Sequence, residues 1–373
     1  MDRKYLLSIV IPTKNRYKYL KYLVEYVDNS FAKESVELII QDNSEDNSEI
    51  LDFLNHHQNE NIKYYHQSGN LALRDNADLA VNNSTGKWVM FIGDDDCFLP
   101  SMIEVLEQPI VEKYECIVTP RLIYVWPDAK DYINYLRTDE YLINYTKDVK
   151  EIDASLELDN VLRQGGQYMN NLPRLYHGIV RRTALKRVWN QYNTYFPGPS
   201  PDMANAVALS LLGTKTLYID YPGVIGGTGY TRVKGNKNAD KQTLKEASFL
   251  PSGTEEKWNS KIPKFWSSST IFAQTVLQVI NETKPDLAER FNWDSFYVTL
   301  GSWFWNPFWD ICKKEKKYNL IPKVLYLKTK AVLYRNFKNI INPLRGYKHY
   351  NLNETDVVKY AAAVEESIGR LSL

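Results

Sequence analysis

The sequence predicts an α/β fold, a doubly wound and mainly parallel sheet flanked by helices, and two patterns support this prediction. Short apolar segments of the kind that form buried strands alternate with segments whose apolar residues recur at helical spacing. The expected strands are Leu6–Ile11, Val36–Ile40, Ile62–Tyr65 and Trp88–Ile92. Because such alternation is typical of βαβ units, the parallel sheet is expected to extend to about residue 120.

The segments between these strands carry helical patterns. After the first strand, Leu20, Leu23, Val24 and Val27 lie on one helical face. A second helix is expected through residues 50–54 and a third over about residues 70–81. Pro100 can begin a fourth, because proline suits the first turn of a helix.

Three aspartates follow the last of these strands. Asp94, Asp95 and Asp96 come directly after Gly93. Three adjacent negative charges need either full hydration, as in a solvated acidic turn, or a cation. Hard cations such as Mg²⁺ or Mn²⁺ prefer oxygen ligands and are often held by one or two carboxylates plus substrate phosphates. Since ligands bind at the carboxyl ends of strands in open α/β sheets, a metal-assisted phosphate site is expected here.

The other strand ends are also polar. Residues 1–100 contain neither of the glycine-rich phosphate-binding motifs, GxGxxG and GxxxxGK[ST]. Asp42 could accept a hydrogen bond from a base edge, and Arg16 could stack on the base. Alternatively, residues 42–44 only cap the next helix, a role that Asp46 or Asn47 could also fill.

Four motifs together resemble the family 2 glycosyltransferases of GT-A fold: Ser8–Arg16, Ile40–Ser44, Asn70–Asn76 and Gly93–Asp96. The resemblance covers about residues 5–120. It implies a nucleotide-sugar site formed by Pro12, Thr13, Asn15, Arg16, Asp42, Asn70, Arg74, Asp94 and Asp95. It also implies a Mn²⁺ or Mg²⁺ ion held in the DxD region by Asp94 and Asp96. Gly93 replaces the acidic residue that often opens this motif, so the ligand could be any of the three aspartates. Asp75 stands where the family often has arginine.

The following residues, up to about 240, are expected to form the acceptor half, with a strand near Leu122–Trp126. Asp202 resembles the family's catalytic base, a carboxylate that accepts the proton of the acceptor hydroxyl; the alternative is a helix cap. His177 is a candidate contact to acceptor or phosphate, and a structural role is an equal alternative. Arg232 lies in a loop that could close over the diphosphate.

The composition narrows the function classes. The 373-residue chain has a net charge of +1, which argues against a nucleic-acid binder. Three cysteines without CxxC spacing favour a reduced, cytoplasmic setting. No apolar segment is long enough to span a membrane.

The expected domains are residues 1–240, with a nucleotide-sugar half to 120 and an acceptor half beyond it, and a helical C-terminal region, 245–373. Between Lys313 and Lys348, eleven Lys or Arg residues accompany a single acid, Glu315. This segment could contact an anionic membrane, bind an anionic glycan or form a solvated helix face.

The leading hypothesis is a metal-dependent, inverting glycosyltransferase that uses a nucleotide-diphosphate sugar, with UDP expected, to modify a glycan, lipid-linked or polyol-phosphate acceptor. A surface-polysaccharide role is an analogy. The alternatives are a non-catalytic nucleotide-sugar binding protein and an aspartate-based phosphotransferase, which would also need a Lys and a Ser/Thr that the sequence does not place. The sequence does not indicate the oligomeric state.

Overall fold

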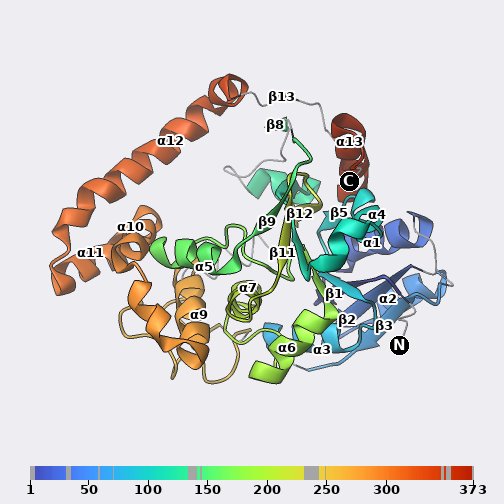
Figure 1. Cartoon of the computed structure of the whole chain (residues 1–373), viewed down its shortest axis with the longest axis horizontal. Helices are drawn as coiled ribbons and strands as arrows, with labels where there is room; N and C mark the ends of the chain where they lie inside the picture. The colour runs from blue at the N-terminus through green and yellow to red at the C-terminus, as the bar shows by residue number, and fades with distance from the viewer. Residues whose placement is uncertain are drawn as a thin grey trace.

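The structure is a computed structural model that describes residues 5–30, 35–57, 59–69, 71–132, 141–142, 145–230, 243–247, 249–345, 348–349 and 354–371. Within them, the main sheet has eight strands (Figure 1). In spatial order these are β3 (Ile62–His66), β2 (Val36–Asp42), β1 (Leu7–Thr13), β4 (Trp88–Phe91), β10 (Gly178–Arg181), β6 (Cys116–Val118), β11 (Thr216–Ile219) and β9 (Val149–Ile152). The four expected strands are the parallel half, β3 to β4, and β10 is antiparallel to both of its neighbours. The predicted α/β fold is confirmed.

A second, three-stranded sheet stands beside the acidic loop. Its strands are β5 (Cys97–Phe98), β12 (Val224–Thr228) and β7 (Arg121–Val125), and β7 is the strand expected near residues 122–126. β12 passes so close to Asp95 that a Cβ atom on Gly227 would lie 1.6 Å from the Asp95 carbonyl oxygen. Only glycine fits there, so this sheet holds its backbone directly against the aspartates.

Helices cover both faces of the main sheet. The first group is α1 (Tyr17–Ser30), α2 (Ser48–Asn55), α3 (Leu73–Asn82), α4 (Ser101–Leu106), α5 (Ala154–Arg163), α6 (Arg182–Tyr192) and α7 (Pro201–Leu211). The C-terminal group is α9 (Ser268–Thr283), α10 (Trp293–Trp303), α11 (Trp305–Glu315), α12 (Ile321–Leu344) and α13 (Val357–Ile368), which confirms the helical C-terminal region. Asn47 precedes α2 without a side-chain cap bond, whereas Asp46 Oδ1 accepts from Ser48 N at 2.9 Å.

Alternating side chains of the parallel strands pack into two separate hydrophobic cores, one on each face of the sheet. Leu7, Ile9 and Ile11 belong to one cluster, together with α1 and α13, whereas Val10 belongs to the other, with α7 and α9. This is the period-2 pattern of a strand buried on both faces. The C-terminal segment therefore adds a helix to each face of the sheet, and the division at residues 240–245 stays a prediction.

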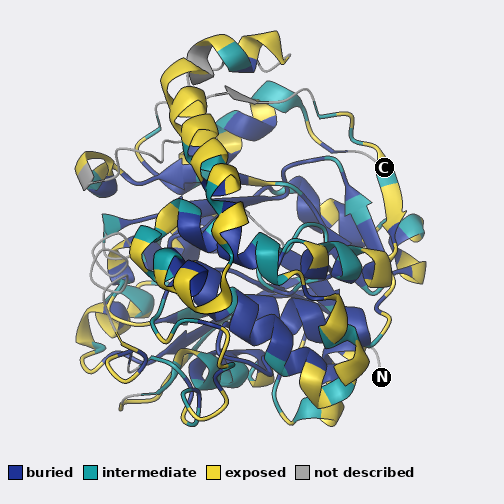
Figure 2. Ribbon diagram, turned by 90° about the vertical axis from the view of Figure 1, so that its left-hand side faces the viewer, coloured by how far each residue is buried: buried dark blue, intermediate teal, exposed yellow. Residues whose placement is uncertain are grey.

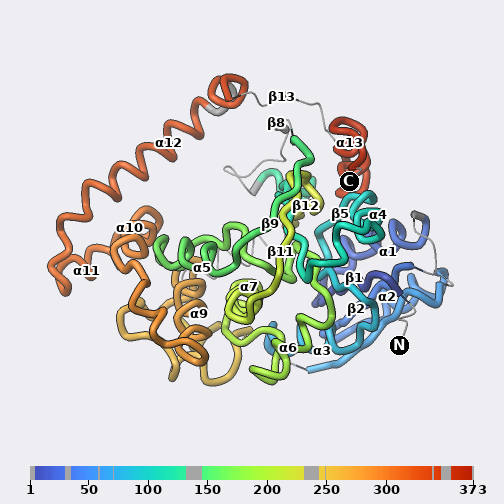
Figure 3. Tube along the Cα trace, in the orientation of Figure 1, coloured from blue at the N-terminus to red at the C-terminus, as the bar shows by residue number. Residues whose placement is uncertain are grey.

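One helix departs from this compact arrangement. The chain leaves the body after α11, runs along α12 and returns past β13 (Lys348–His349) to α13, as the trace shows (Figure 3). Most of α12 is exposed (Figure 2). Among the described residues, no helix is both long and apolar enough to cross a membrane.

Candidate active site

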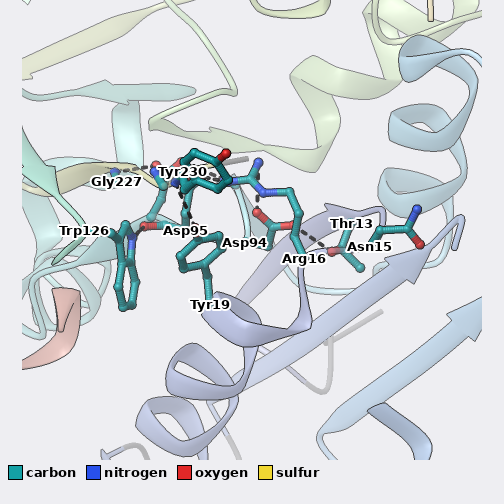
Figure 4. A network of polar contacts seen from close by, with 12 residues as sticks. Thr13, Asn15, Arg16, Tyr19, Asp94, Asp95, Trp126, Gly227 and Tyr230 are labelled. Atoms are coloured by element: carbon teal, nitrogen blue, oxygen red, sulfur yellow. Dashed lines mark hydrogen bonds and ion pairs between the residues drawn. The ribbon is translucent and has the colours of Figure 1, made fainter. Parts of the chain in front are cut away.

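The site begins where the first and fourth strands end. β1 and β4 are adjacent and parallel, so their carboxyl ends meet at one edge of the sheet. The hydroxyl of Thr13, the last residue of β1, donates to Asp94 Oδ2 at 2.7 Å (Figure 4). The loop after β1 is therefore tied to the acidic loop that follows β4.

Arg16 lies between two of the aspartates. Its Nη1 atom is 3.2 Å from Asp94 Oδ1, and its Nη2 atom forms an ion pair with Asp95 Oδ2 (Figure 4). Burial raises the pKa of Asp94, although the Arg16 charge opposes this. Burial alone would lower the pKa of Arg16. The negative charges of Asp94 and Asp95 more than offset this effect, so the net pKa is raised and the guanidinium stays charged. Without substrate, the protein itself neutralises these two carboxylates.

Asp96 has a different environment. Its carboxylate is fully buried, and its Oδ2 atom accepts from Gly93 N and His177 Nε2, both at 2.7 Å, and from the Tyr176 hydroxyl at 3.2 Å. Its Oδ1 atom accepts from Gly227 N at 2.8 Å. Asp96 thus joins β12 and the segment before β10 to the acidic loop. Its expected role as a metal ligand stays a prediction, and this arrangement does not favour it.

His177 lies behind Asp96 and is 4% exposed. Arg121 Nη1 is 3.2 Å from His177 Nδ1. Because a guanidinium can only donate, Nδ1 accepts and the Nε2 hydrogen is directed to Asp96. His177 has a backbone φ of +59°, a left-handed conformation that few non-glycine residues adopt. This geometry favours the structural alternative, and contact with acceptor or phosphate stays a prediction.

A cavity of about 420 Å³ opens in front of the acidic loop. It brings together five of the predicted site residues: Pro12, Arg16, Asp94, Asp95 and Asp202. Much of the remaining wall is aromatic, formed by Phe91, Tyr176, Phe196, Phe249, Trp266 and Phe272. Acidic groups from the sheet edge and Asp202 from α7 therefore face the same space.

Asp202 lies in the first turn of α7, and its position there explains its orientation. Pro201 begins the helix, and Asp202 Oδ1 accepts from Met203 N at 2.9 Å and from the Ser200 hydroxyl. Ser200 occupies the N-cap position, yet its own side chain makes no cap bond. Asp202 Oδ2 accepts no hydrogen bond from the residues that the structure describes. One carboxylate oxygen is thus fixed at a helix N-terminus and the other is free to act.

Asp42 is the clearest departure from expectation. It was expected to contact a nucleobase or to cap the next helix, but it is the last residue of β2 and fully buried. Its Oδ2 atom accepts from the Tyr17 and Tyr64 hydroxyls, both at 2.6 Å, and its Oδ1 atom accepts from Ser44 N at 2.8 Å. Asp42 does not line the 420 Å³ cavity. Removing this carboxylate would leave three residues without their partner, so the contacts favour a structural role, and contact with a nucleobase stays a prediction.

Four predicted residues remain, of which the structure describes two. Asn15 adopts a left-handed φ of +57° and donates its backbone N–H to Ser44 Oγ at 2.8 Å, so it joins the loops after β1 and β2. Arg74 pairs with its neighbour Asp75 and does not line the cavity. Asn70 and Arg232 lie outside the described residues, and their roles stay predictions.

Sequence reasoning missed the aromatic wall and the partners of the buried carboxylates. Phe249, Trp266 and Phe272 come from the C-terminal segment, and no pattern in the sequence connects them to the acidic loop. No sequence pattern indicated that the hydroxyls of Tyr17 and Tyr64 would bind a buried carboxylate. A high tyrosine content, 27 residues, was the only available signal, and it carries no positional information.

The side chains at the site can be compared with the ligands that a divalent cation prefers. No group of three or more His, Cys, Asp or Glu residues suited to a metal occurs within the described ranges. However, Asp94 Oδ1 is buried and receives no hydrogen bond, and its one close partner is the Arg16 guanidinium. Asp94 and Asp95 both line the cavity, and carboxylate oxygens suit Mg²⁺ or Mn²⁺ when substrate phosphates complete the coordination. The residues present fit such an ion at these two positions.

Comparison with known proteins gives a family model and a curated relative that match part of the chain. Residues 8–161 match the family model described as glycosyl transferase family 2. Glycosyltransferase GlyG of Streptococcus pneumoniae is 25% identical over 168 residues, which is 44% of this chain and 52% of that protein. The match thus spans about half the length of this curated relative.

Solved structures with a similar trace include the following two. TarS 1–349 of S. aureus, in complex with UDP-GlcNAc, has a TM-score of 0.49 at 14% identity, over 97% of this chain and 91% of its own. The mannosyltransferase PcManGT of Pyrobaculum calidifontis, in complex with GDP-Man and Mn²⁺, has a TM-score of 0.44 at 11% identity, over 97% and 86%.

The family match begins in β1 and includes the whole acidic loop and the strands that position it. The parallel half of the sheet, the aspartates at its carboxyl edge and this match agree with the resemblance seen in the sequence. Residues 8–161 thus match a family 2 glycosyltransferase domain, and the α/β fold agrees with the GT-A fold that the resemblance implies.

Proposed function

We propose that this protein is a metal-dependent, inverting glycosyltransferase that moves a sugar from a nucleotide-diphosphate donor, a UDP-sugar, to a hydroxyl of a glycan or polyol-phosphate-type acceptor. The observation that carries the proposal is the shared cavity, which Asp94 and Asp95 line together with Asp202. A donor phosphate and an acceptor hydroxyl need opposite sides of one space for in-line displacement.

The contacts of each residue indicate its role in the proposed reaction. Asp202 Oδ2, which is free of described donors, would accept the proton of the acceptor hydroxyl as that oxygen attacks the anomeric carbon. Arg16, freed from Asp94 and Asp95 on substrate binding, would turn its charge toward the diphosphate. A Mn²⁺ or Mg²⁺ ion held through Asp94 and Asp95 would supply positive charge to the leaving diphosphate. Attack from the side opposite the leaving group inverts the anomeric configuration.

The aromatic wall supports a glycan as acceptor. Trp266 and Phe249 lie with their ring centroids 5.6 Å apart in an edge-to-face pair at the cavity. Aromatic faces suit the C–H face of a pyranose ring, and the polar groups nearby suit its hydroxyls. A cytoplasmic setting agrees with three buried and unpaired cysteines, Cys97, Cys116 and Cys312. A lipid-linked acceptor would bring the protein to a membrane, and contact through residues 313–348 stays a prediction.

Incubation with a panel of nucleotide sugars and candidate acceptors tests the proposal. Release of nucleoside diphosphate should require Mn²⁺ or Mg²⁺ and stop with EDTA, and the anomeric configuration of the product, read by NMR, should be inverted. Tight donor binding without turnover on any acceptor would instead favour a non-catalytic nucleotide-sugar binding protein. Metal-independent turnover would remove the ion from the mechanism.

A further inference from the structure

The outer part of α12 carries a row of exposed apolar side chains. Tyr326, Leu333, Phe337, Ile340 and Leu344 follow one another at intervals of seven, four, three and four residues, which places them on one helical face. Their exposed fractions are 65%, 50%, 47%, 61% and 82%. We call this row the α12 stripe. Soluble proteins rarely leave so many large apolar side chains together in water, so the stripe is expected to have an occupant.

The described part of this chain does not supply that occupant. The first turns of α12 pack against α10 and the short helix Tyr318–Leu320, and Val324 is fully buried there. Residues 329–337 are exposed on every side, and α12 stands apart from the body of the molecule in Figure 1. Most of the stripe therefore lies beyond the part of α12 that packs against α10.

Charge around the stripe identifies the kind of occupant. No Asp or Glu occurs from Lys316 through Arg345. By helical position, Lys323, Lys330 and Arg345 lie along one edge of the stripe, and none of the three has an ion-pair partner in the described ranges. An apolar face with basic residues at its margin and no acids matches an anionic lipid surface.

The nearby lysines of α11 and the following turn differ in this respect. Lys313 lies 3.9 Å from Asp310, Lys314 lies 3.8 Å from Glu315, and Lys317 lies 2.7 Å from Asp294. These ion pairs partly neutralise the cluster at residues 313–317. The uncompensated positive charge of this region therefore lies on α12, beside the stripe.

We propose that α12 lies flat on an anionic lipid bilayer, with the α12 stripe in the headgroup region and its basic edge at the lipid phosphates. The helix does not span the bilayer, because basic residues interrupt its apolar sequence. A second copy of this chain is a poorer occupant, since antiparallel or parallel pairing would bring like charges together. This inference does not rest on the proposed enzymatic function, because binding to lipid needs no donor or acceptor.

Vesicle flotation of the full chain tests the proposal with a matched control. The stripe variant is Leu333→Ser with Phe337→Ser and Ile340→Ser, and the control is Leu51→Ser with Leu156→Ser, two leucines that are 41% and 57% exposed elsewhere. Vesicles contain phosphatidylcholine alone or with about a third phosphatidylglycerol. Wild type and control should float with the anionic vesicles only, and the stripe variant should bind at least tenfold more weakly. Lys323→Gln, Lys330→Gln and Arg345→Gln should each weaken binding by roughly fivefold, less so at high salt.

Two results would overturn the proposal. One is equal flotation of wild type and stripe variant, and the other is no binding of wild type to anionic vesicles. Light scattering on the same proteins adds a further arm: dimers of wild type that the stripe variant loses, without vesicle binding, would assign the stripe to a second copy. Donor turnover with a soluble acceptor should be equal in all variants, so failure of lipid binding is distinguishable from failure of the enzymatic proposal.

Discussion

The two sides of the cavity satisfy their carboxylates in different ways. On the sheet side, Asp94 and Asp95 are already paired with Thr13 and Arg16. On the α7 side, Asp202 is bonded through one oxygen, and the wall of the same cavity includes several aromatic rings. The sheet side is thus prepared to exchange an internal cation for a metal and a diphosphate, whereas the α7 side keeps one basic oxygen available. This contrast matches the needs of a donor and an acceptor.

The largest expected effect comes from the α7 side. Asp202→Asn should lower turnover by a factor on the order of 10²–10⁴, because a positioned general base contributes about that much. Asparagine keeps a side-chain oxygen that can accept from Met203 N and the Ser200 hydroxyl, so a purely structural Asp202 would lose little on this change. Steady-state kinetics with Asp286→Asn, an exposed acid outside the cavity, as the control separates the two. Near-normal transfer by Asp202→Asn would end its assignment as base.

On the sheet side, the buried carboxylates should matter first for stability. Asp42→Ala should lower the free energy of unfolding by about 2–4 kcal/mol, because the Tyr17 and Tyr64 hydroxyls lose their acceptor. Urea denaturation measures this, with Asp52→Ala on the exposed face of α2 as the control. Unchanged stability would mean that these tyrosines find other partners and that Asp42 is free to bind a nucleobase.

Glu37, near the start of β2, is a further buried carboxylate with which those at the cavity can be compared. Burial would raise the pKa of Glu37, but hydrogen bonds from Lys63, Ser8 and Thr85 outweigh it and the net pKa is lowered. Its stabilising contribution should therefore be complete above the unfolded pKa of about 4.3 and be lost as the pH falls through the lower folded value. Denaturation of wild type and Glu37→Gln from pH 3 to 7 should show their difference shrinking only in acid. A difference independent of pH would contradict this.

The smallest expected effect concerns the aromatic wall. Trp266→Ala should raise the KM for the acceptor about tenfold, because one ring contact is lost, and leave UDP affinity unchanged. Trp303→Ala removes a ring that is 72% exposed and outside the cavity, and it serves as the control. A loss of UDP affinity in Trp266→Ala would place this wall on the donor side and break the contrast between the two sides.

Local patterns were enough to predict the parallel half of the sheet. Each of its strands is a short apolar run with a polar or glycine stop, so β1, β2 and β4 were located to within a few residues, together with the acidic loop that follows β4. The same patterns placed Asp202 at the start of a helix, as a possible cap, and the structure has it in the first turn behind the N-cap Ser200. These features depend on neighbours in the sequence.

The sequence did not reveal which aspartates face the cavity, because that depends on distant partners. Asp96 turns inward because His177 and Gly227, 81 and 131 residues away, donate to it. Asp42 is buried because two tyrosines happen to reach it. The aromatic wall comes from a C-terminal segment whose contact with the sheet edge is tertiary. Such contacts follow from packing rather than from local preference.

Calorimetric titration with UDP, with and without Mn²⁺, tests the central claim most directly. Wild type should bind UDP more tightly when Mn²⁺ is present. Asp95→Asn should lose this metal-dependent gain, and Asp202→Asn should keep it unchanged. If Asp202→Asn lost the gain, or if Asp95→Asn kept it, the division of the cavity into a metal-assisted donor side and a proton-accepting α7 side would be wrong.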